Sequence, residues 1–409
     1  MEIDTACVHG SVDRSHNTGA ICTPIYQSAT FAHPAVGQTN GYDYSRLQNP
    51  TREQLEKTVA RLEGGYDALA FSTGMAAESC LIELFSPGDE IIASDDLYGG
   101  TVRLFEHIAR KNGVSVNYVN TSNVEAVRQS ITERTKAVFL ETPSNPMMHV
   151  TDIKAIKETL VDAGAGRGSA QACAGRGQKA PPLFGGVGGG APDPKDIILV
   201  VDNTFLSPYL CQPLSLGADI VIHSGTKYLG GHNDTLAGFL VVSEPTLSEK
   251  LRFIQKTTGA NLSPFDSYML IRGIKTLAIR MEKAQANAAR IVDWMLKQDK
   301  IAAVHYVGLP NHPGIEITKR QTRGFGAMIS FETDTVETAR QILNRVSLIL
   351  FAESLGGVET LITYPLMQTH GDVPPEKRAA LGITEKLLRL SVGIENVDDL
   401  IADLDAALA

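Results

Sequence analysis

Residues 218–242 read "ADIVIHSGTKYLGGHNDTLAGFLVV", and the pattern of these residues indicates the fold class. Two short apolar runs, 219–224 and 236–242, have the length and composition of buried strands. A Ser-Gly-Thr turn and one lysine, Lys227, lie between them. Strands that are apolar throughout are typical of sheets covered on both faces. A lysine directly after such a strand lies at the edge of the sheet where ligands bind in these folds.

Further strand-like runs precede this stretch and alternate with helix-like segments; they cover residues 67–72, 89–94, 115–120, 136–141 and 196–202. Strands that alternate with helices form parallel sheets, because each crossover helix returns the chain to the same edge. The sequence therefore predicts an α/β fold whose large domain holds a mostly parallel, seven-stranded sheet.

The rest of the chain divides around this sheet. Residues 1–55 are rich in Thr, Gly, Asn and Pro and predict an irregular N-terminal arm, which ends in a helix start where Thr51 and Gln54 have capping-box spacing. Residues 56–260 form the predicted large domain. Long helical stretches, strand candidates and a last helix over residues 261–409 predict a smaller C-terminal α+β domain.

Residues 164–194 interrupt the alternation of strands and helices with a run rich in Gly, Ala and Pro. Glycine this dense is costly to order, and little apolar surface is present to offset that cost. We expect a poorly ordered surface insertion, with a regulatory or lid role as the alternative. Its glycine spacings resemble a dinucleotide-binding fingerprint, but no strand precedes them and no helix follows, which counts against that function.

Composition excludes several classes of protein. The 409 residues carry a formal charge of -9, which counts against a nucleic-acid-binding protein. No apolar run is long enough to span a bilayer and the first residues lack the features of a signal peptide, so we expect a cytoplasmic protein without a membrane partner. The five cysteines form no C-x-x-C pair and predict neither a disulfide framework nor a metal site.

Polar and small residues follow the predicted strands at the edge where ligands gather in parallel sheets. They include a small-residue turn at 73–75, Tyr98, Asn145, Asp202 and Lys227. Each has an ordinary structural explanation, such as a turn, a buried ring or a helix cap. Together they supply backbone N–H groups for a phosphate, an aromatic plane, an amide, a carboxylate and an amine.

This set matches pyridoxal phosphate (PLP), a planar phosphorylated aldehyde with a pyridine ring. A lysine forms a Schiff base with its aldehyde, and a carboxylate keeps the ring nitrogen protonated so that the ring can accept electrons from a carbanion. A P-loop nucleotidase would need a Gly-Lys pair, which the chain lacks. A zinc hydrolase would need closely spaced histidines, and lysine and glycine stand in their place around Lys227.

Segments spread along the chain resemble the motifs of one family. In chain order they are "YDYSRLQNPTREQLE", "STGMAA", "DLYGGT", "ETPSNP", "VDNTF", "HSGTKYLGGHND", "RGIKTL", "AESLGGVETLITYP" and "LRLSVGIE". The chain resembles the Cys/Met-metabolism (trans-sulfuration) family of PLP enzymes, which includes cystathionine γ-synthases, γ-lyases and β-lyases. The resemblance covers nearly the whole chain outside 164–194, and it implies the fold-type I, aspartate aminotransferase-like architecture.

The resemblance implies a role for each matched residue of the cofactor site. Lys227 would be the Schiff-base lysine and Asp202 the partner of the pyridine nitrogen. Tyr98 would stack on the ring and help with protons at the leaving group, and Asn145 would contact the ring. The phosphate would be held by Gly74, Met75, Ser224 and Thr226 and, from the neighbouring subunit, by Tyr44 and Arg46.

A site shared between subunits needs at least a dimer, and members of the family commonly form tetramers built from two dimers. We therefore expect a homotetramer in which the N-terminal arm reaches the site of its neighbour.

The substrate positions of the family are also matched. Arg389 would clamp the α-carboxylate of the substrate, with Ser354 near it. Glu353, Asp43 and Arg103 match the acidic and basic positions of enzymes that recognise a second amino acid, whose ammonium and carboxylate they complement. Solvated charges at the rim of the site are the alternative interpretation.

The motifs favour one branch of the family. Gly100 stands where methionine γ-lyases carry a reactive cysteine, which counts against that activity. "RGFGAMISFE" and "FDSYMLIRGIKTLAIRME" look most like γ-synthases, so we expect a reaction at Cγ that joins cysteine to an O-acylhomoserine. Cystathionine γ-lyase, β-lyase and O-acetylhomoserine sulfhydrylase activities are alternatives. A PLP-binding relative without catalysis is the alternative from another class, and the presence of all the inferred catalytic residues counts against it.

Overall fold

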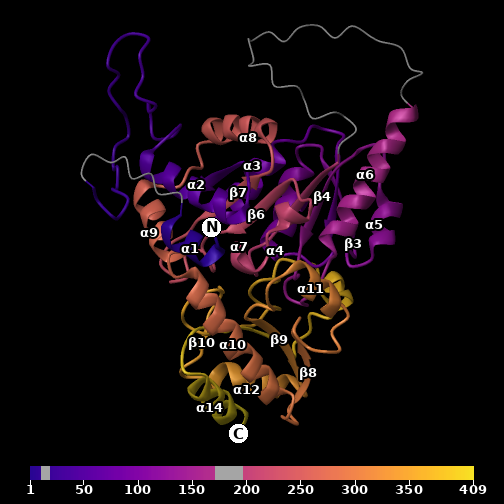
Figure 1. Cartoon of the computed structure of the whole chain (residues 1–409). Helices are drawn as coiled ribbons and strands as arrows, with labels where there is room; N and C mark the ends of the chain where they lie inside the picture. The colour runs from indigo at the N-terminus through magenta and orange to yellow at the C-terminus, as the bar shows by residue number, and fades with distance from the viewer. Residues whose placement is uncertain (11–18, 171–196) are drawn as a thin grey trace.

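The structure is a computed structural model, and it describes residues 1–10, 19–170 and 197–409. In this part of the chain a seven-stranded sheet and a five-stranded sheet organise the helices around them (Figure 1). None of the helices described has the length and hydropathy of a membrane span.

The large sheet has the strand order β1-β7-β6-β5-β4-β2-β3. Its strands are β1 Asp67–Phe71, β2 Glu90–Ser94, β3 Ser115–Val119, β4 Thr135–Glu141, β5 Ile198–Asp202, β6 Ile220–Ser224 and β7 Gly238–Val242. Neighbouring strands are parallel except at β7, which is antiparallel to both β1 and β6. The predicted mostly parallel, seven-stranded sheet is confirmed.

Helices cover both faces of this sheet. They are α2 Pro50–Glu63, α3 Gly74–Ile82, α4 Gly99–Leu104 with the π-turn η1 Phe105–Ala109, α5 Val124–Ser130, α6 Ile153–Ala170, α7 Ser207–Leu210, the 3-10 turn η3 Pro213–Leu216, α8 Pro245–Thr258 and α9 Pro264–Ile274. Successive residues of a strand point to opposite faces. Ala70 therefore packs with Leu55 of α2, whereas Phe71 packs with Leu81 of α3 and Leu251 of α8. Burial on both faces explains why the strands read as continuous apolar runs.

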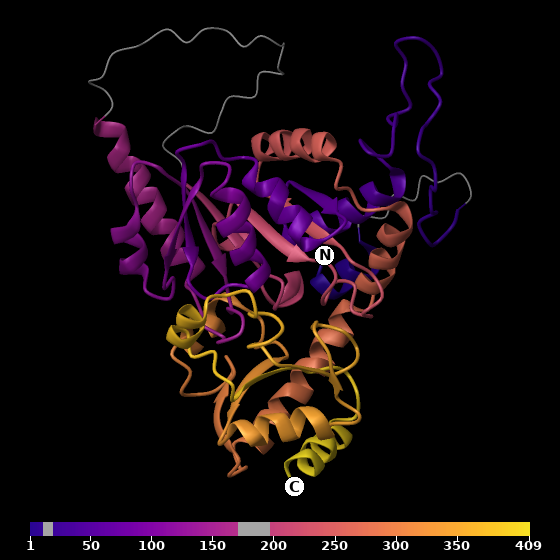
Figure 2. The ribbon, with the colours of Figure 1, turned by 180° about the vertical axis from the view of Figure 1, so that it is seen from behind.

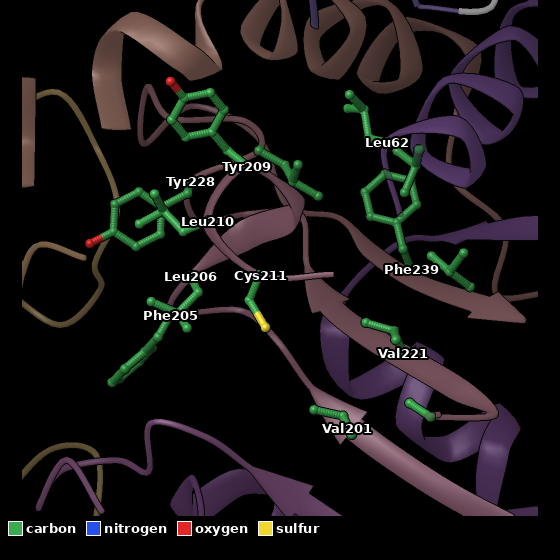
Figure 3. Packing of buried hydrophobic residues seen from close by; sticks show 14 of the residues in the cluster. Leu62, Val201, Phe205, Leu206, Tyr209, Leu210, Cys211, Val221, Tyr228 and Phe239 are labelled. Carbon is green, nitrogen blue, oxygen red and sulfur yellow. The ribbon is translucent and has the colours of Figure 1, made fainter. Parts of the chain in front are cut away.

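Figure 3 shows part of the core on the α2 face. Leu62 of α2 lies close to Phe239 of β7, and Val201 and Val221 project from β5 and β6 into the same layer. Cys211, after α7, is buried in this layer too. This apolar layer supports the ends of β5 and β6, from which Asp202 and Ser224 emerge.

The small sheet has the order β10-β11-β12-β9-β8 and is antiparallel except between β10 and β11. Its strands are β8 Ile301–His305, β9 Met328–Thr333, β10 Leu350–Phe351, β11 Leu361–Thr363 and β12 Leu387–Ser391. The helices around it are α10 Leu277–Met295, α11 Ile315–Gln321, α12 Val336–Arg345, α13 Pro375–Ala380 and α14 Val397–Leu408. The predicted second, α+β part is confirmed.

Helix α10 belongs to both hydrophobic cores. Leu277 and Met281 at its start pack in the core of the large sheet, and Ile291 and Met295 at its end pack in the core of the small sheet. In both views the C-terminal part of the chain, in orange and yellow, lies below the large sheet, at one end of its strands (Figures 1 and 2). The domain limits 1–55, 56–260 and 261–409 stay predictions.

The N-terminal arm differs in two respects from its prediction. Residues Ile3–His9 form a helix, α1, whose Ala6 and Cys7 pack in the core of the large sheet. Helix α2 does not use the predicted capping box: the side chain of Asn49 accepts hydrogen bonds from the backbone N–H groups of Thr51 and Arg52. The hydroxyl of Thr51 instead bonds to the arm, because it donates to the carbonyl of Pro24.

The start of the predicted insertion, at residue 164, overlaps the end of helix α6. Helix α6 continues to Ala170, so the first residues of the Gly-rich run are helical. Once a helix has formed, each further residue adds a hydrogen bond at small cost, and this allows α6 to run through unfavourable residues. Residues 171–194 of the predicted insertion lie outside the described residues.

Candidate active site

Lys227 follows β6 and is partly buried. Its Nζ donates a hydrogen bond to Oγ of Ser354, 3.0 Å away. Burial, followed by the charge of Arg389, lowers the pKa of Lys227 and the charge of Glu353 opposes them, which leaves a pKa of about 8. A fraction of the amine is therefore neutral near neutral pH, as a nucleophile or a base must be.

Arg389 on β12 is a buried cation surrounded by neutral acceptors. Its Nη1 donates to Oδ1 of Asn145 at 2.8 Å, and its Nη2 donates to the carbonyl of Ser354 at 3.2 Å and to Oγ1 of Thr363 at 3.3 Å. It forms no ion pair with any residue that the structure describes, and its Nε has no partner. Burial lowers its pKa to about 10. A buried guanidinium without a carboxylate is a strong site for an anionic ligand.

Tyr98 is held at the start of α4. Its backbone N–H donates to Oε2 of Glu141 at 2.8 Å. A Cβ on Gly100 would overlap the Tyr98 ring and come 3.0 Å from Sδ of Met75, so a larger residue here would require these two side chains to shift. Burial and the charge of Glu353 raise the pKa of Tyr98, so its hydroxyl keeps its proton at neutral pH.

The start of α3 offers backbone donors beside Ser224. Thr73 caps the helix by accepting the N–H of Ala76 at 2.9 Å, and the N–H groups of Gly74 and Met75 lie in the first turn, where no helix carbonyl is available. A Cβ on Gly74 would lie 3.2 Å from Cβ of Ser224, so the two predicted phosphate ligands are adjacent. The Ser224 hydroxyl has no hydrogen-bond partner among the described residues. These donors form a cradle for an anion.

The hydroxyl of Thr226, unlike that of Ser224, already forms hydrogen bonds within the chain. This hydroxyl donates to the carbonyl of Ala237 at 3.2 Å and accepts the N–H of the same residue at 3.0 Å. The backbone beside β7 thus occupies most of its bonding capacity, and its contact with phosphate stays a prediction.

Asp202 ends β5 and lies opposite Glu141 of β4 in the sheet register. Its Oδ1 accepts the N–H of Thr204 at 2.9 Å, and it forms no ion pair in the described part of the chain. Burial raises its pKa. A carboxylate in this position is stabilised by a cationic partner, such as a protonated ring nitrogen.

Two buried acids near Asp202 escaped the sequence analysis. Glu78 on α3 accepts a hydrogen bond from the hydroxyl of Thr101 at 3.1 Å, and burial followed by the charge of Asp202 raises its pKa to about 8. Burial and Asp202 also raise the pKa of Glu141 well above its usual range. The charge of Asp202 thus favours the protonated form of both Glu78 and Glu141. Glu141 opens the "ETPSNP" motif, and a charge at the end of an apolar strand was the available signal.

Glu353 and Arg103 are exposed charged residues whose charges act on Tyr98, and we call their position the mouth of the site. Both act on the hydroxyl of Tyr98, since Glu353 raises its pKa and Arg103 lowers it. Glu353 is exposed and has no hydrogen-bond or ion-pair partner among the residues described. Arg103 instead forms an ion pair with Asp372, a residue that the sequence analysis did not single out.

The arm residues do not join this cluster within one chain. Nη1 of Arg46 donates to the carbonyl of Lys256 at 2.6 Å, and its guanidinium lies 5.5 Å from the centre of the Tyr44 ring. Oδ1 of Asp43 lies 3.2 Å from Nε2 of His33. Figure 1 shows the arm, in indigo, projecting beyond the body of the chain. The contact of Tyr44 and Arg46 with the phosphate site of a neighbouring subunit stays a prediction.

The arrangement fits PLP. The cradle of α3 and Ser224 suits its phosphate, the uncompensated Asp202 suits its ring nitrogen, the ring of Tyr98 offers a stacking plane and Lys227 offers an amine of lowered pKa. In the described part of the chain, no group of three or more His, Cys, Asp or Glu is arranged to hold a metal ion.

Comparison with known proteins agrees with this fit. The family model described as "Cys/Met metabolism PLP-dependent enzyme" matches residues 4–165 and 191–409. The cystathionine β-lyase of Lactococcus lactis subsp. cremoris (strain MG1363) is 43% identical, with 99% of this chain and 98% of the relative covered. The cystathionine γ-synthase of Haemophilus influenzae (strain ATCC 51907 / DSM 11121 / KW20 / Rd) is 42% identical, with coverage of 100% and 98%.

A solved structure shares the fold over its full length. The crystal structure of cystathionine γ-lyase from Lactobacillus plantarum, complexed with L-serine, has a TM-score of 0.89 and 40% identity, covering 100% of this chain and 98% of the other. The family model leaves residues 166–190 unmatched, within the Gly-rich run.

Proposed function

The chain belongs to the Cys/Met metabolism family of PLP-dependent enzymes, and we propose that it joins cysteine to an O-acylhomoserine to make cystathionine. The observation that carries the proposal is the pair of opposite charges, Glu353 and Arg103, which act on Tyr98 at the mouth of the site. A second substrate with an ammonium and a carboxylate complements such a pair. Relatives of similar identity are named as synthases and lyases, so cystathionine γ-lyase is the second candidate.

Each residue has a part in this reaction. Bound PLP supplies an electron sink that stabilises negative charge at the substrate Cα. Arg389 binds the α-carboxylate, which fixes the amino acid in one orientation. Nζ of Lys227, with its lowered pKa, removes a proton from Cα. It then helps a second proton to leave Cβ, which the departure of a group on Cγ requires. The protonated hydroxyl of Tyr98 gives its proton to the departing group on Cγ.

The residues around the ring tune its chemistry. Asp202 would pair with the ring nitrogen and keep it protonated, and Glu141 holds the backbone of Tyr98 in place. Asn145 links the two sides of the site, because its amide accepts a hydrogen bond from Arg389. We also propose that the enzyme is cytoplasmic and forms a homotetramer in which neighbouring subunits share active sites.

A substrate panel tests the reaction. O-acetylhomoserine and O-succinylhomoserine are each supplied with cysteine or sulfide, cystathionine is supplied alone, and the products are identified. We expect cystathionine from an O-acylhomoserine and cysteine as the fastest reaction. Release of cysteine and a 2-oxo acid of four carbons from cystathionine, with no synthesis, would instead establish the γ-lyase. Release of homocysteine and pyruvate would establish attack at Cβ.

A further inference from the structure

The ion pair between Arg103 and Asp372 joins two distant parts of the chain at the mouth of the site. Arg103 lies on α4, one turn after Tyr98, and its Nη1 donates to Oδ2 of Asp372. The two side chains are 53% and 65% exposed. Water screens an ion pair this exposed, so an incoming charged group can break it.

The turn that carries Asp372 is fixed against α4. A Cβ on Gly99 would overlap the carbonyl oxygen of Thr369, so the two backbones touch. Nε2 of His370, which is buried, lies 3.2 Å from the carbonyl of Leu97 and 3.1 Å from that of Asn145. Both neighbours are acceptors, so this nitrogen carries the proton and donates to both. The carboxylate of Asp372 therefore stays near Arg103 without help from a ligand.

The two charges at the mouth differ in their availability. Glu353 is exposed and unpaired among the described residues, so an incoming ammonium finds it free. Arg103 is already neutralised by Asp372. A carboxylate that approaches Arg103 has to displace Asp372 first, whereas a partner without a carboxylate does not.

We propose that Asp372 is a specificity-determining residue that competes with the carboxylate of the second amino acid for Arg103. The inference rests on the proposed function in one respect, namely that a second amino acid enters at this mouth. By occupying Arg103, Asp372 lowers the affinity of the enzyme for a second substrate that carries a carboxylate, such as cysteine. Sulfide has no carboxylate, so its affinity is lowered less.

Asp372→Asn tests the competition, because asparagine keeps the shape and removes the charge. Glu376→Gln is the matched control: Glu376 is an exposed acid on the neighbouring helix α13 and has no ion pair in the described part of the chain. We expect Asp372→Asn to lower the KM for cysteine about two- to fivefold, the effect typical of an exposed ion pair. The KM for sulfide and the kcat should change less. Higher salt should shrink the difference.

A double-mutant cycle with Arg103→Ala completes the test. In the Arg103→Ala background, Asp372→Asn should leave the KM for cysteine unchanged. An unchanged or higher KM for cysteine in the single variant Asp372→Asn overturns the competition. An equal fall for Glu376→Gln also overturns it, since net charge alone would then explain the effect.

The proposed function can fail separately. A wild-type enzyme that uses neither cysteine nor cystathionine overturns that function. If Asp372→Asn then gains use of either one, the competition is supported; if it gains none, the competition is overturned as well.

Discussion

Glu353 is exposed at the mouth of the site and has no partner among the described residues, so its charge is available to a substrate. Glu353→Gln should lower kcat/KM for cysteine about three- to tenfold, because a screened carboxylate contributes less than a buried one. Sulfide has no ammonium and should lose much less. Steady-state kinetics with both partners and one homoserine ester measures the ratio. Equal losses with both would mean that Glu353 supports the structure of the mouth.

Arg389 should behave differently from Glu353, since every amino-acid substrate carries an α-carboxylate. Arg389→Lys keeps the charge but loses the fork that holds Asn145 and Ser354. We expect a loss of about a hundredfold or more in kcat/KM for cystathionine and for homoserine esters alike. Arg345→Lys, at the exposed end of α12, is the control. A loss confined to one substrate would contradict the assigned role.

Among the elements, the start of α2 allows two capping arrangements to be compared: the observed cap by Asn49 and the predicted capping box of Thr51 and Gln54. Asn49 accepts two backbone N–H groups and also donates to the carbonyl of Tyr26 at 2.9 Å. Asn49→Ala should therefore destabilise the protein by about 1–2 kcal/mol. Gln54→Ala, at the predicted capping-box position, should cost much less. Chemical unfolding of both variants, followed by circular dichroism, compares them. A larger loss for Gln54→Ala would restore the capping box.

The turn over α4 makes stability depend on pH through His370. Burial lowers the pKa of His370 to about 4, from an ordinary value of 6.5. Below pH 6.5 the imidazole of His370 is protonated in the unfolded chain but stays neutral in the folded chain down to about pH 4. Stability therefore falls as the pH drops from 6.5 to about 4. His370→Gln should flatten this acid branch while lowering stability at pH 7.5. Melting temperatures measured across this pH range test the prediction, with His33→Gln as an exposed control. If His370→Gln leaves the fall in stability at acid pH unchanged, other groups cause that fall.

The elements and the site differ in how far sequence could predict them. The strands of the large sheet were predictable because burial on both faces leaves continuous apolar runs. The positions of Lys227, Asp202 and Tyr98 at the ends of strands were predictable for the same reason, and their roles stay predictions. Glu78 and Asp372 were not, because their importance depends on contacts between helices and turns that are far apart in the chain. Asn49 was missed because Thr51, with Gln54 three positions on, offered an equally plausible cap.

At the scale of the whole molecule, the separation of Arg46 from the other site residues predicts sites built by two subunits. Arg46→Ala should weaken retention of PLP without unfolding the chain. Mixing the impaired Arg46→Ala protein with the Lys227→Ala protein, after subunit exchange is demonstrated, should raise the activity above that of either protein alone, because one site in each hybrid receives both wild-type residues. An exchanged mixture that stays inactive would mean that the site is not shared. Sedimentation of the wild type tests the expected tetramer.

The order of strands in the large sheet has a consequence for the chain as it leaves the ribosome. Strand β1 is among the first strands to be made, yet its neighbour in the sheet is β7, which ends at Val242. Until that residue has emerged, β1 exposes both of its hydrogen-bonding edges, a recognised route to aggregation. Nascent chains that stop before Gly238 should therefore bind chaperones, whereas longer ones can close the sheet during synthesis.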